Sequence, residues 1–287
     1  MMDLLSSPLF IRSVLAALLV GISAPVVGSY LVNRRLSMLG DGIGHVALTG
    51  VALGWVVGSA ANIVPIDKLA VPGALVASIG AAVIIELVRR SGRTSADVIL
   101  AILFYGGIAL GVVLIGLAGG TSTQLNSYLF GSLATVSTSD LILIAVMAVL
   151  IFVFGVGLRA ALFVVTSDED FATATGLPVD RLSMLVAIMS AVTVAVSMRV
   201  VGALLVSALM IVPIAITQMF ARSFRSTMVI GSILGAILCV TGLLITYQVD
   251  ISPGATIVVL AVTIYAALFV FKSIAERLRP RTRATQD

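Results

Sequence analysis

Nine apolar stretches follow one another along the chain, and each has about the length of a membrane-spanning helix. A helix needs about 17 to 25 mainly apolar residues to cross the roughly 30 Å hydrocarbon core of a bilayer. The pattern predicts an all-α, polytopic transmembrane helical bundle of eight to nine spans, forming a single transmembrane domain over residues 1–287. The stretches lie at 13–32, 42–60, 69–88, 96–118, 139–157, 183–198, 201–220, 227–247 and 254–271, and the sixth is marginal in length.

Composition supports the same class of protein. Hydrophobic residues make up 60% of the chain and charged residues only 10%, whereas about a quarter of an ordinary soluble domain is charged. The net charge of +4 does not indicate a nucleic-acid partner, because the basic residues lie between the apolar stretches. The composition instead predicts that membrane lipid surrounds the chain. The lone Cys239 lies in an apolar stretch, where packing is its expected role.

The basic residues also predict an orientation. Of the 17 lysines and arginines, all but Arg12, Lys68 and Arg199 fall in alternate connections between the nine stretches. Because basic residues concentrate in cytoplasmic loops, the C-terminus is expected in the cytoplasm and the N-terminus outside. If the weak sixth stretch were not a span, the number would be eight and the two termini would lie on one side.

The segment from Arg34 to His45 carries an acid and the only histidine of the chain. Asp41 and His45 are four residues apart, so both side chains project from one face of a helix. Counted from Arg35 at the interface, a rise of ~1.5 Å per residue places them about 9 and 15 Å into the hydrocarbon core. Ionisable side chains are costly at such depth and mark functional sites by default.

Three roles for Asp41 and His45 follow from this spacing. Zinc and its first-row neighbour manganese accept nitrogen and oxygen ligands, and two copies of the chain about a twofold axis would supply the four ligands of a tetrahedral zinc site. The two side chains could instead relay protons. They could also bond to each other or to a backbone carbonyl and stabilise the helix. The spacing alone leaves all three open.

The loop between the fifth and sixth stretches predicts one short helix at about 167–177. Ser167 or Asp168 can cap it, its acidic residues suit the positive end of the helix dipole, and Gly176 with Pro178 ends it. The charge distribution places this helix in the cytoplasm. It is either a plain connection or the surface that a docking partner contacts.

Three further features concern packing and helix geometry. The fourth stretch carries glycines at 106, 107, 111 and 116, which permit close contact with another helix. Pro213 lies inside the seventh stretch, where its missing N–H group favours a kink. Arg199 marks the outer end of the sixth stretch and is expected to extend toward the membrane surface.

The segment Arg34–Leu48, continued by Gly50–Gly54, resembles the signature of the metal-specific permease family of ABC importers, which move zinc, manganese or iron. The resemblance extends over nearly the whole chain, and Arg199 followed by Val-Val-Gly is most similar to the zinc permeases. Thr49 stands where proline is common in the family, and Tyr105 where zinc permeases often have histidine. The other matching segments are Ser127–Leu133, Met198–Leu205, Ile211–Pro213 and Phe220–Arg222.

This resemblance implies a type II-like ABC importer permease in the bacterial cytoplasmic membrane. A second permease copy would complete the pathway as a homodimer, a cytoplasmic ABC ATPase dimer would dock beneath it, and an extracytoplasmic metal-binding protein would deliver the ion. Asp41 and His45 match the family's metal-contacting pair, and the loop helix matches its coupling helix. The residues implied in ATPase coupling are Asp168, Glu169, Asp170, Ala172 and Gly176.

The chain itself lacks a nucleotide-binding motif. It contains no G-x-x-x-x-G-K-[ST] segment, and its two lysines, Lys68 and Lys272, follow no glycine-rich loop. We therefore expect no enzymatic activity and no permanently bound cofactor, with energy supplied by a separate ATPase. The function predicted is the permease subunit of an ATP-driven divalent metal importer working by alternating access, most favourably for zinc.

Two alternatives accompany this prediction. A manganese or iron permease of the same family fits the same residues. A proton-coupled secondary transporter would use Asp41 and His45 as a relay, but such transporters usually carry internal repeats, and the pattern around Asp41 and His45 occurs only once. A membrane scaffold would leave the acid and the imidazole without a role.

Overall fold

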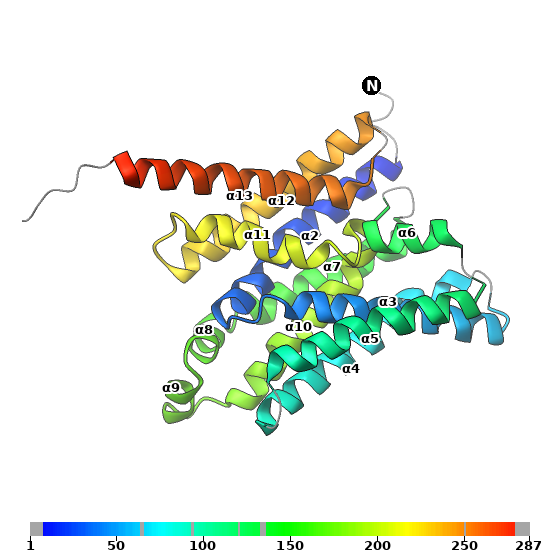
Figure 1. The fold of residues 1–287 in the computed structure, drawn as a ribbon, viewed down its shortest axis with the longest axis horizontal. Coiled ribbons are helices and arrows are strands. Elements are labelled where there is room, and N and C mark those ends of the chain that lie inside the picture. The colour runs from blue at the N-terminus through cyan, green and yellow to red at the C-terminus, as the bar shows by residue number, and fades with distance from the viewer. Residues whose placement is uncertain are drawn as a thin grey trace, which may run out of the picture.

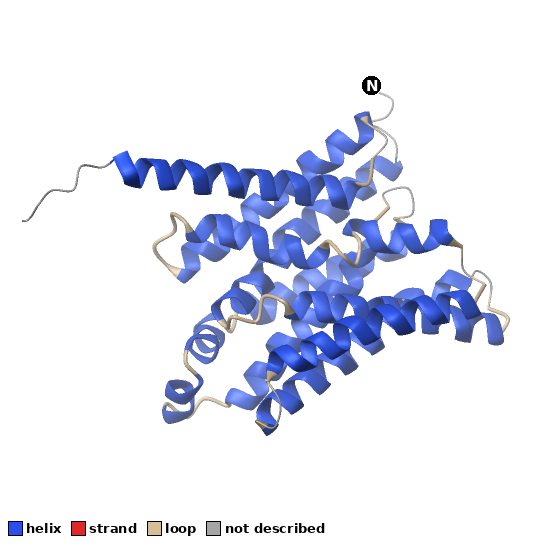
Figure 2. Ribbon diagram, in the orientation of Figure 1, coloured by secondary structure: helices blue, strands red, loops and turns tan. Residues whose placement is uncertain are grey.

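The computed structural model describes residues 8–63, 66–92, 95–119, 121–132, 136–249 and 251–278, and within these ranges all regular elements are helices (Figures 1 and 2). The all-helical class predicted from the sequence is confirmed. The elements are α2 Pro8–Asn33, α3 Leu39–Ala60, η1 Ile66–Leu69, α4 Ala70–Ser91, α5 Ala96–Leu117, α6 Ser122–Phe130, α7 Thr138–Ile151, the π-helical η2 Phe152–Val156, α8 Arg159–Ser167, α9 Glu169–Ala174, α10 Val179–Val201, α11 Val206–Gln218, α12 Phe224–Gln248 and α13 Pro253–Leu278.

Eight of the described helices are long and apolar enough to cross a membrane. The sixth span, expected to be marginal, is the full-length helix α10 of 23 residues. The short one is instead α11, which has 13 residues and therefore a length of about 20 Å, less than the roughly 30 Å of a bilayer core. The sequence pattern misplaced the weak span because Gly202–Leu205 is apolar but forms a turn.

Two ends of the bundle can be defined by their contacts. At the α9 end, which carries the short helix α9, the amide of Asn33 at the end of α2 donates hydrogen bonds to Thr166 (3.0 Å) and Ser167 (2.8 Å). At the opposite end, Arg199 forms ion pairs with Asp67 (2.7 Å) and Asp140 (2.9 Å). In Figure 1 the α9 end lies to the left, and α6 lies toward the right.

With α11 added to these eight helices, the described part of the chain passes between these ends nine times. Helix α10 begins at the α9 end, where Asp180 pairs with Arg90 at 3.3 Å, and it finishes at the opposite end with Arg199. Helix α12 begins back at the α9 end, since the Phe224 ring packs against Tyr30 with centroids 5.3 Å apart. Residues 202–223 must therefore return from one end to the other, with α11 as the helical part of that crossing.

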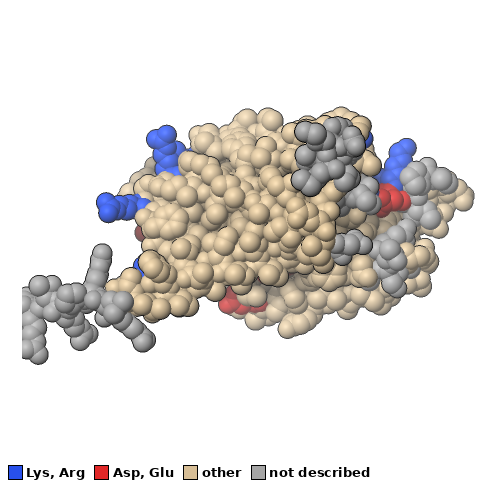
Figure 3. Space-filling model, turned by 90° about the horizontal axis from the view of Figure 1, so that it is seen from above, with Lys and Arg blue, Asp and Glu red and all other residues tan. Residues whose placement is uncertain are grey.

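Charged side chains separate toward the two ends. Seen from above in Figure 3, most visible lysine, arginine, aspartate and glutamate atoms lie near the left and right ends of the long axis, with a broad band of uncharged atoms between them. This distribution suits a protein whose middle lies in hydrocarbon and whose ends meet water and lipid headgroups. Eight apolar helices in this arrangement make the chain a multi-pass membrane protein.

The interruption in the seventh apolar stretch lies at Gly202 and not at Pro213. Gly202 has φ +99°, a conformation that side chains with a Cβ rarely adopt, and helix α10 stops there. Pro213 lies within α11, which is continuous from Val206 to Gln218. Cys239 is buried and unpaired, as expected of a packing residue.

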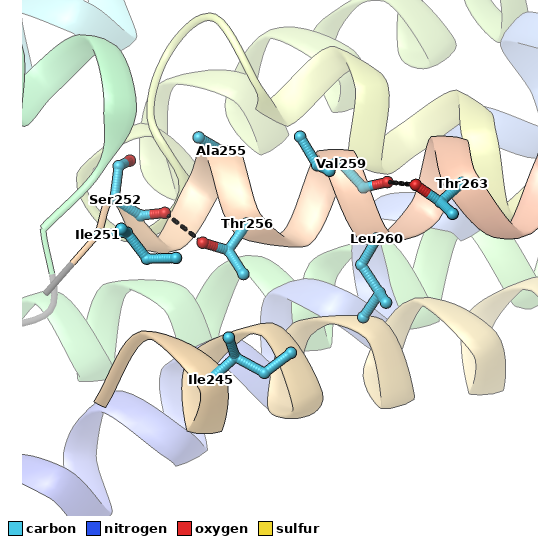
Figure 4. A pocket seen from close by; sticks show the side chains of 8 residues that line it. All are labelled: Ile245, Ile251, Ser252, Ala255, Thr256, Val259, Leu260 and Thr263. Atoms are coloured by element: carbon cyan, nitrogen blue, oxygen red, sulfur yellow. Dashed lines mark hydrogen bonds between the residues drawn. The ribbon is translucent and has the colours of Figure 1, made fainter. Parts of the chain in front are cut away.

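A groove of about 400 Å³ lies between the end of α12 and the start of α13 (Figure 4). Its lining is mainly aliphatic, and its threonine hydroxyls bond to carbonyls of their own helix: Thr256 to Ser252 at 2.8 Å and Thr263 to Val259 at 2.7 Å. These hydroxyls are already satisfied, so the groove offers no strong ligands to a cation.

Candidate functional site

Asp41 and His45 lie on successive turns at the start of α3. A tight turn after α2, in which Arg35 has φ +59°, leads into the helix, and Asp41 falls in its first turn. Asp41 is half-buried, and His45 is 7% exposed. The structure thus keeps both side chains one helical turn apart on α3, as their spacing predicts.

The two side chains have different neighbours and do not bond to each other. The Ser207 hydroxyl, from the first turn of α11, donates a hydrogen bond to Asp41 Oδ1. The imidazole of His45 packs edge-on against Phe104, with ring centroids 4.2 Å apart. Among the described residues, no hydrogen bond or ion pair holds the imidazole nitrogens. Direct pairing of Asp41 with His45, one of the three roles considered, is therefore absent from the structure.

One copy of the chain brings together only two candidate metal ligands at this place. Within the described ranges, no group of three or more histidine, cysteine, aspartate or glutamate side chains comes together. Asp41 and His45 offer one carboxylate and one imidazole, which is a donor set that zinc and manganese accept. A stable four-coordinate site would need further ligands from outside this chain.

The α3 glycines let the α11 segment reach Asp41. A Cβ on Gly40 would lie 3.1 Å from the Ser207 Cβ, and one on Gly44 would lie 2.9 Å from the carbonyl oxygen of Ala203. Side chains at these positions would push the 203–207 segment away from α3. These glycines therefore allow a close approach of two segments within one chain.

Helix α5 packs against the other side of His45. A Cβ on Gly107 would lie only 2.8 Å from the His45 carbonyl carbon, whereas Gly106 has open space around its Cβ position. The glycines expected to permit close helix contact thus divide between two faces of α5. Tyr105, which stands at the position where zinc permeases often have histidine, is 69% exposed, and its neighbour Phe104 contacts His45 instead.

At the opposite end, Arg199 joins four elements. Its guanidinium pairs with Asp67 before α4 and with Asp140 at the start of α7, and it lies 5.8 Å from the ring centroid of Tyr128 on α6. Asp67 also accepts hydrogen bonds from Tyr128 and from Trp55 (3.3 Å). The expectation that Arg199 extends toward the membrane surface is wrong, because two carboxylates hold it within the bundle.

The loop helix forms as α9, but it is shorter than the range 167–177 suggests. Asp168 caps it by accepting a hydrogen bond from the Phe171 amide at 2.9 Å, and Gly176 ends the turn with φ +78°. Ala172 is fully buried, whereas Asp170 is exposed and Phe171 is 57% exposed. The helix therefore has one face packed on the bundle and one face open to a partner.

Glu169 points to the packed face of α9. One carboxylate oxygen accepts from Arg34 at 2.5 Å and the other accepts from Arg89 at 3.1 Å. Burial by itself would raise the pKa of Glu169, but the hydrogen bonds from Arg34 and Arg89 hold it below its usual value. Glu169 ties α9 to the ends of α2 and α4 and does not project outward with Asp170.

Glu86 on α4 is the acid at the centre of this cluster, and it was not singled out from the sequence. Its carboxylate is 2% exposed and pairs with Arg34 (3.5 Å), Arg89 (2.8 Å) and Arg90 (3.1 Å). A glutamate placed three and four residues before two arginines is a visible signal of local pairing. The contact with Arg34 is not local and requires the fold. Ser207 gave no sequence signal, because serine is common in such helices.

The whole chain resembles known transport proteins. A model of the ABC 3 transport family matches residues 6–272. The chain is 31% identical over 270 residues to the manganese transport system membrane protein MntC of Halalkalibacterium halodurans, covering 94% of this chain and 89% of that one. It is 28% identical over 284 residues to the chelated iron transport system membrane protein YfeD of Yersinia pestis, covering 96% and 91%.

A solved structure shows the same architecture. PsaBC from Streptococcus pneumoniae in complex with Fab superposes with a TM-score of 0.81 at 29% identity, covering 93% of this chain and 94% of that one. The likeness therefore includes all of the spans and not only the segment around Asp41 and His45. Since the family model and the relatives cover nearly the full length, the chain belongs to the ABC 3 transport family.

Proposed function

We propose that this chain is the membrane permease of a bacterial ABC importer and that its cargo, a divalent metal cation, passes Asp41 and His45 during alternating access. The observation that carries the proposal is the buried imidazole of His45, which no described residue holds by a hydrogen bond and which lies one turn from a carboxylate. An acid and an imidazole within a membrane-spanning helix are costly enough to mark a functional site by default.

The cation site is completed by a second copy of the chain. One copy offers two ligands, and the described residues contain no larger cluster of metal-binding side chains. Two copies about a twofold axis supply two carboxylates and two imidazoles, which matches the four ligands of tetrahedral zinc. A homodimer in the cytoplasmic membrane is the assembly that this geometry favours.

The donor set and the relatives favour different cations. Two imidazoles with two carboxylates suit zinc, so zinc remains the cargo favoured by the residues. MntC and YfeD are manganese and chelated iron transport proteins by name, and this supports manganese or iron as the second candidate. All three are first-row cations that bind nitrogen and oxygen ligands.

The energy for transport is proposed to come from a cytoplasmic ATPase dimer that docks on the open face of α9. The exposed Phe171 and Asp170 supply an apolar and an acidic contact, while the packed face is joined to the bundle through Glu169. Gly176, which has a positive φ, lets the chain turn after α9. An extracytoplasmic metal-binding protein would deliver the cation at the opposite end.

Uptake by the assembled complex tests this proposal. We would reconstitute the permease with its ATPase and metal-binding protein in liposomes and measure competition among Zn²⁺, Mn²⁺ and Fe²⁺. His45→Ala and Asp41→Asn are expected to abolish ATP-dependent uptake. Asp97→Asn, which removes an exposed carboxylate at the start of α5, is the matched control and is expected to transport normally.

The rival mechanism gives a different result in the same vesicles. If the permease alone moved metal on a proton gradient without ATPase, it would be a secondary transporter, and the ABC assignment of its energy source would be wrong. If His45→Ala transported all three cations normally, the cation would not pass this histidine and the proposed site would have to be abandoned.

A further inference from the structure

The contact between Ser207 and Asp41 limits how Asp41 can bind a cation. The Ser207 hydroxyl has one proton and donates it to Asp41 Oδ1. Ser207 is itself buried, and it comes from α11, 166 residues further along the chain. One carboxylate oxygen therefore already accepts a hydrogen bond from the protein, whereas the other accepts none from the described residues and is the oxygen more open to cargo.

The fold places Ser207 in this position through contacts on two sides. The turn before α11 is bound to the end of α6, because the amides of Ala203 and Leu204 donate to the carbonyls of Tyr128 (2.8 Å) and Leu129 (3.3 Å). On the other side, Gly40 lets the Ser207 side chain lie directly against α3. The backbone at Ser207 therefore cannot move away from α3 without disturbing the contacts between this turn and α6.

Asp41 and Ser207 meet where two helices begin. Asp41 lies in the first turn of α3, and Ser207 lies in the first turn of α11. The direction of the Asp41 carboxylate is therefore set by its hydrogen bond from the Ser207 hydroxyl.

We propose that Ser207 is a specificity-determining residue of the cation site, because it restricts Asp41 to binding through a single oxygen. This proposal rests on the proposed function of Asp41 and His45. With one oxygen and one nitrogen per copy, a dimer offers four ligands, the number that zinc prefers. Manganese prefers more ligands, mostly oxygen, and would gain them if both oxygens of each Asp41 were free.

Metal binding by the permease–ATPase complex in detergent tests this role without a transport assay. Isothermal titration with Zn²⁺ alone and with Mn²⁺ alone would give both affinities for wild type, Ser207→Ala and Ser207→Thr. Loss of a residue that orients a metal ligand typically costs about 10- to 100-fold in affinity. Ser207→Ala is therefore expected to weaken Zn²⁺ binding by about that factor and to weaken Mn²⁺ binding less or strengthen it.

The controls separate specificity from folding. Ser207→Thr keeps the hydroxyl donor and is expected to retain the wild-type ratio of affinities. Ser190→Ala removes another buried hydroxyl, one that bonds only to Val186 of its own helix at 2.8 Å, and is expected to change neither affinity. The electron paramagnetic resonance spectrum of bound Mn²⁺ provides a second measurement, since a change in carboxylate binding alters it in Ser207→Ala alone.

Each outcome has a definite meaning. An unchanged ratio of Zn²⁺ to Mn²⁺ affinity in Ser207→Ala, or an equal loss for both cations, would overturn the proposal for Ser207 while leaving the cation site in place. Normal binding of both cations by His45→Ala, measured in parallel, would instead overturn the proposed function on which it rests. A ratio of affinities that shifts toward Mn²⁺ in Ser207→Ala and not in Ser207→Thr supports the proposal for Ser207.

Discussion

The hydroxyl of Thr49 donates a 2.7 Å hydrogen bond to the carbonyl of Gly107, and it thereby ties α3 to α5 one turn beyond His45. Thr49 also lies 3.4 Å from the His45 carbonyl. This bond requires the two backbones to approach closely, which Gly107 allows because it has no side chain. Thr49, which stands where the resembling family commonly has proline, therefore helps to hold α5 against the turn of α3 that follows His45.

Gly107→Ala is expected to destabilise the permease. The new Cβ would meet the His45 backbone at 2.8 Å, and overpacking of this kind costs about 1–3 kcal/mol. Thermal unfolding of the purified protein in detergent measures the loss. Gly106→Ala, one residue away with nothing near its Cβ position, is the control and is expected to be neutral or slightly stabilising. Equal melting temperatures for the two variants would show that α5 does not pack on α3 as described.

Glu86→Gln is expected to weaken the α9 end strongly. The buried carboxylate pairs with Arg34, Arg89 and Arg90, and breaking a buried ion pair costs roughly 3–5 kcal/mol. The loss in free energy of unfolding should lie near the lower end of this range, because Arg89 and Arg90 are partly exposed. The control is Asp180→Asn in the same cluster, since Asp180 is 79% exposed and surface pairs contribute at most about 1 kcal/mol. Chemical denaturation would give the free energy of unfolding of both variants. A larger loss in Asp180→Asn than in Glu86→Gln would contradict the central place of Glu86 in this cluster.

The pairing of Glu169 predicts a pH dependence with a definite sign. Its pKa is held below the ordinary value of 4.5 by Arg34 and Arg89, although burial opposes this. A lowered pKa means that the pairing stabilises the folded protein above pH 4.5 and that this contribution is lost as the pH falls through the lower value. The melting-temperature difference between wild type and Glu169→Gln should stay constant from about pH 7 to pH 5 and shrink only in stronger acid. A difference that vanished near neutral pH would mean a raised pKa and refute the prediction.

Arg199→Gln is expected to destabilise the end of the bundle that lies opposite α9. Without the guanidinium, both Asp140 and Asp67 lose their ion pair with Arg199. A buried polar group left without its partner, here Asp140, lowers the free energy of unfolding by about 1–3 kcal/mol, and by more when it is charged. Protease accessibility of the segment around Asp67, together with the melting temperature, would report the change. Lys68→Gln removes an exposed positive charge from the adjacent residue and should leave both measurements unchanged.

The class of protein and much of the local structure follow from the sequence alone. Span lengths, the separation of charge between the two ends, the i, i+4 placement of Asp41 and His45, and the helix capped by Asp168 and ended by Gly176 depend on hydropathy, helical period and local capping. These are properties of short segments, so neighbouring residues are sufficient to predict them. The marginal span was assigned wrongly because hydropathy does not distinguish the apolar turn at Gly202 from a helix.

Only the tertiary structure decided which distant groups act on these residues. It placed Ser207 on Asp41 across 166 residues, directed Glu169 toward Arg34 and Arg89 rather than toward a partner, and divided the glycines of α5 between a packed and an open face. Such contacts depend on how whole helices approach one another, and this is determined by packing of the complete bundle. The sequence alone determined that an acid and an imidazole share one helix within a membrane, and the fold determined which oxygen of that acid is left free.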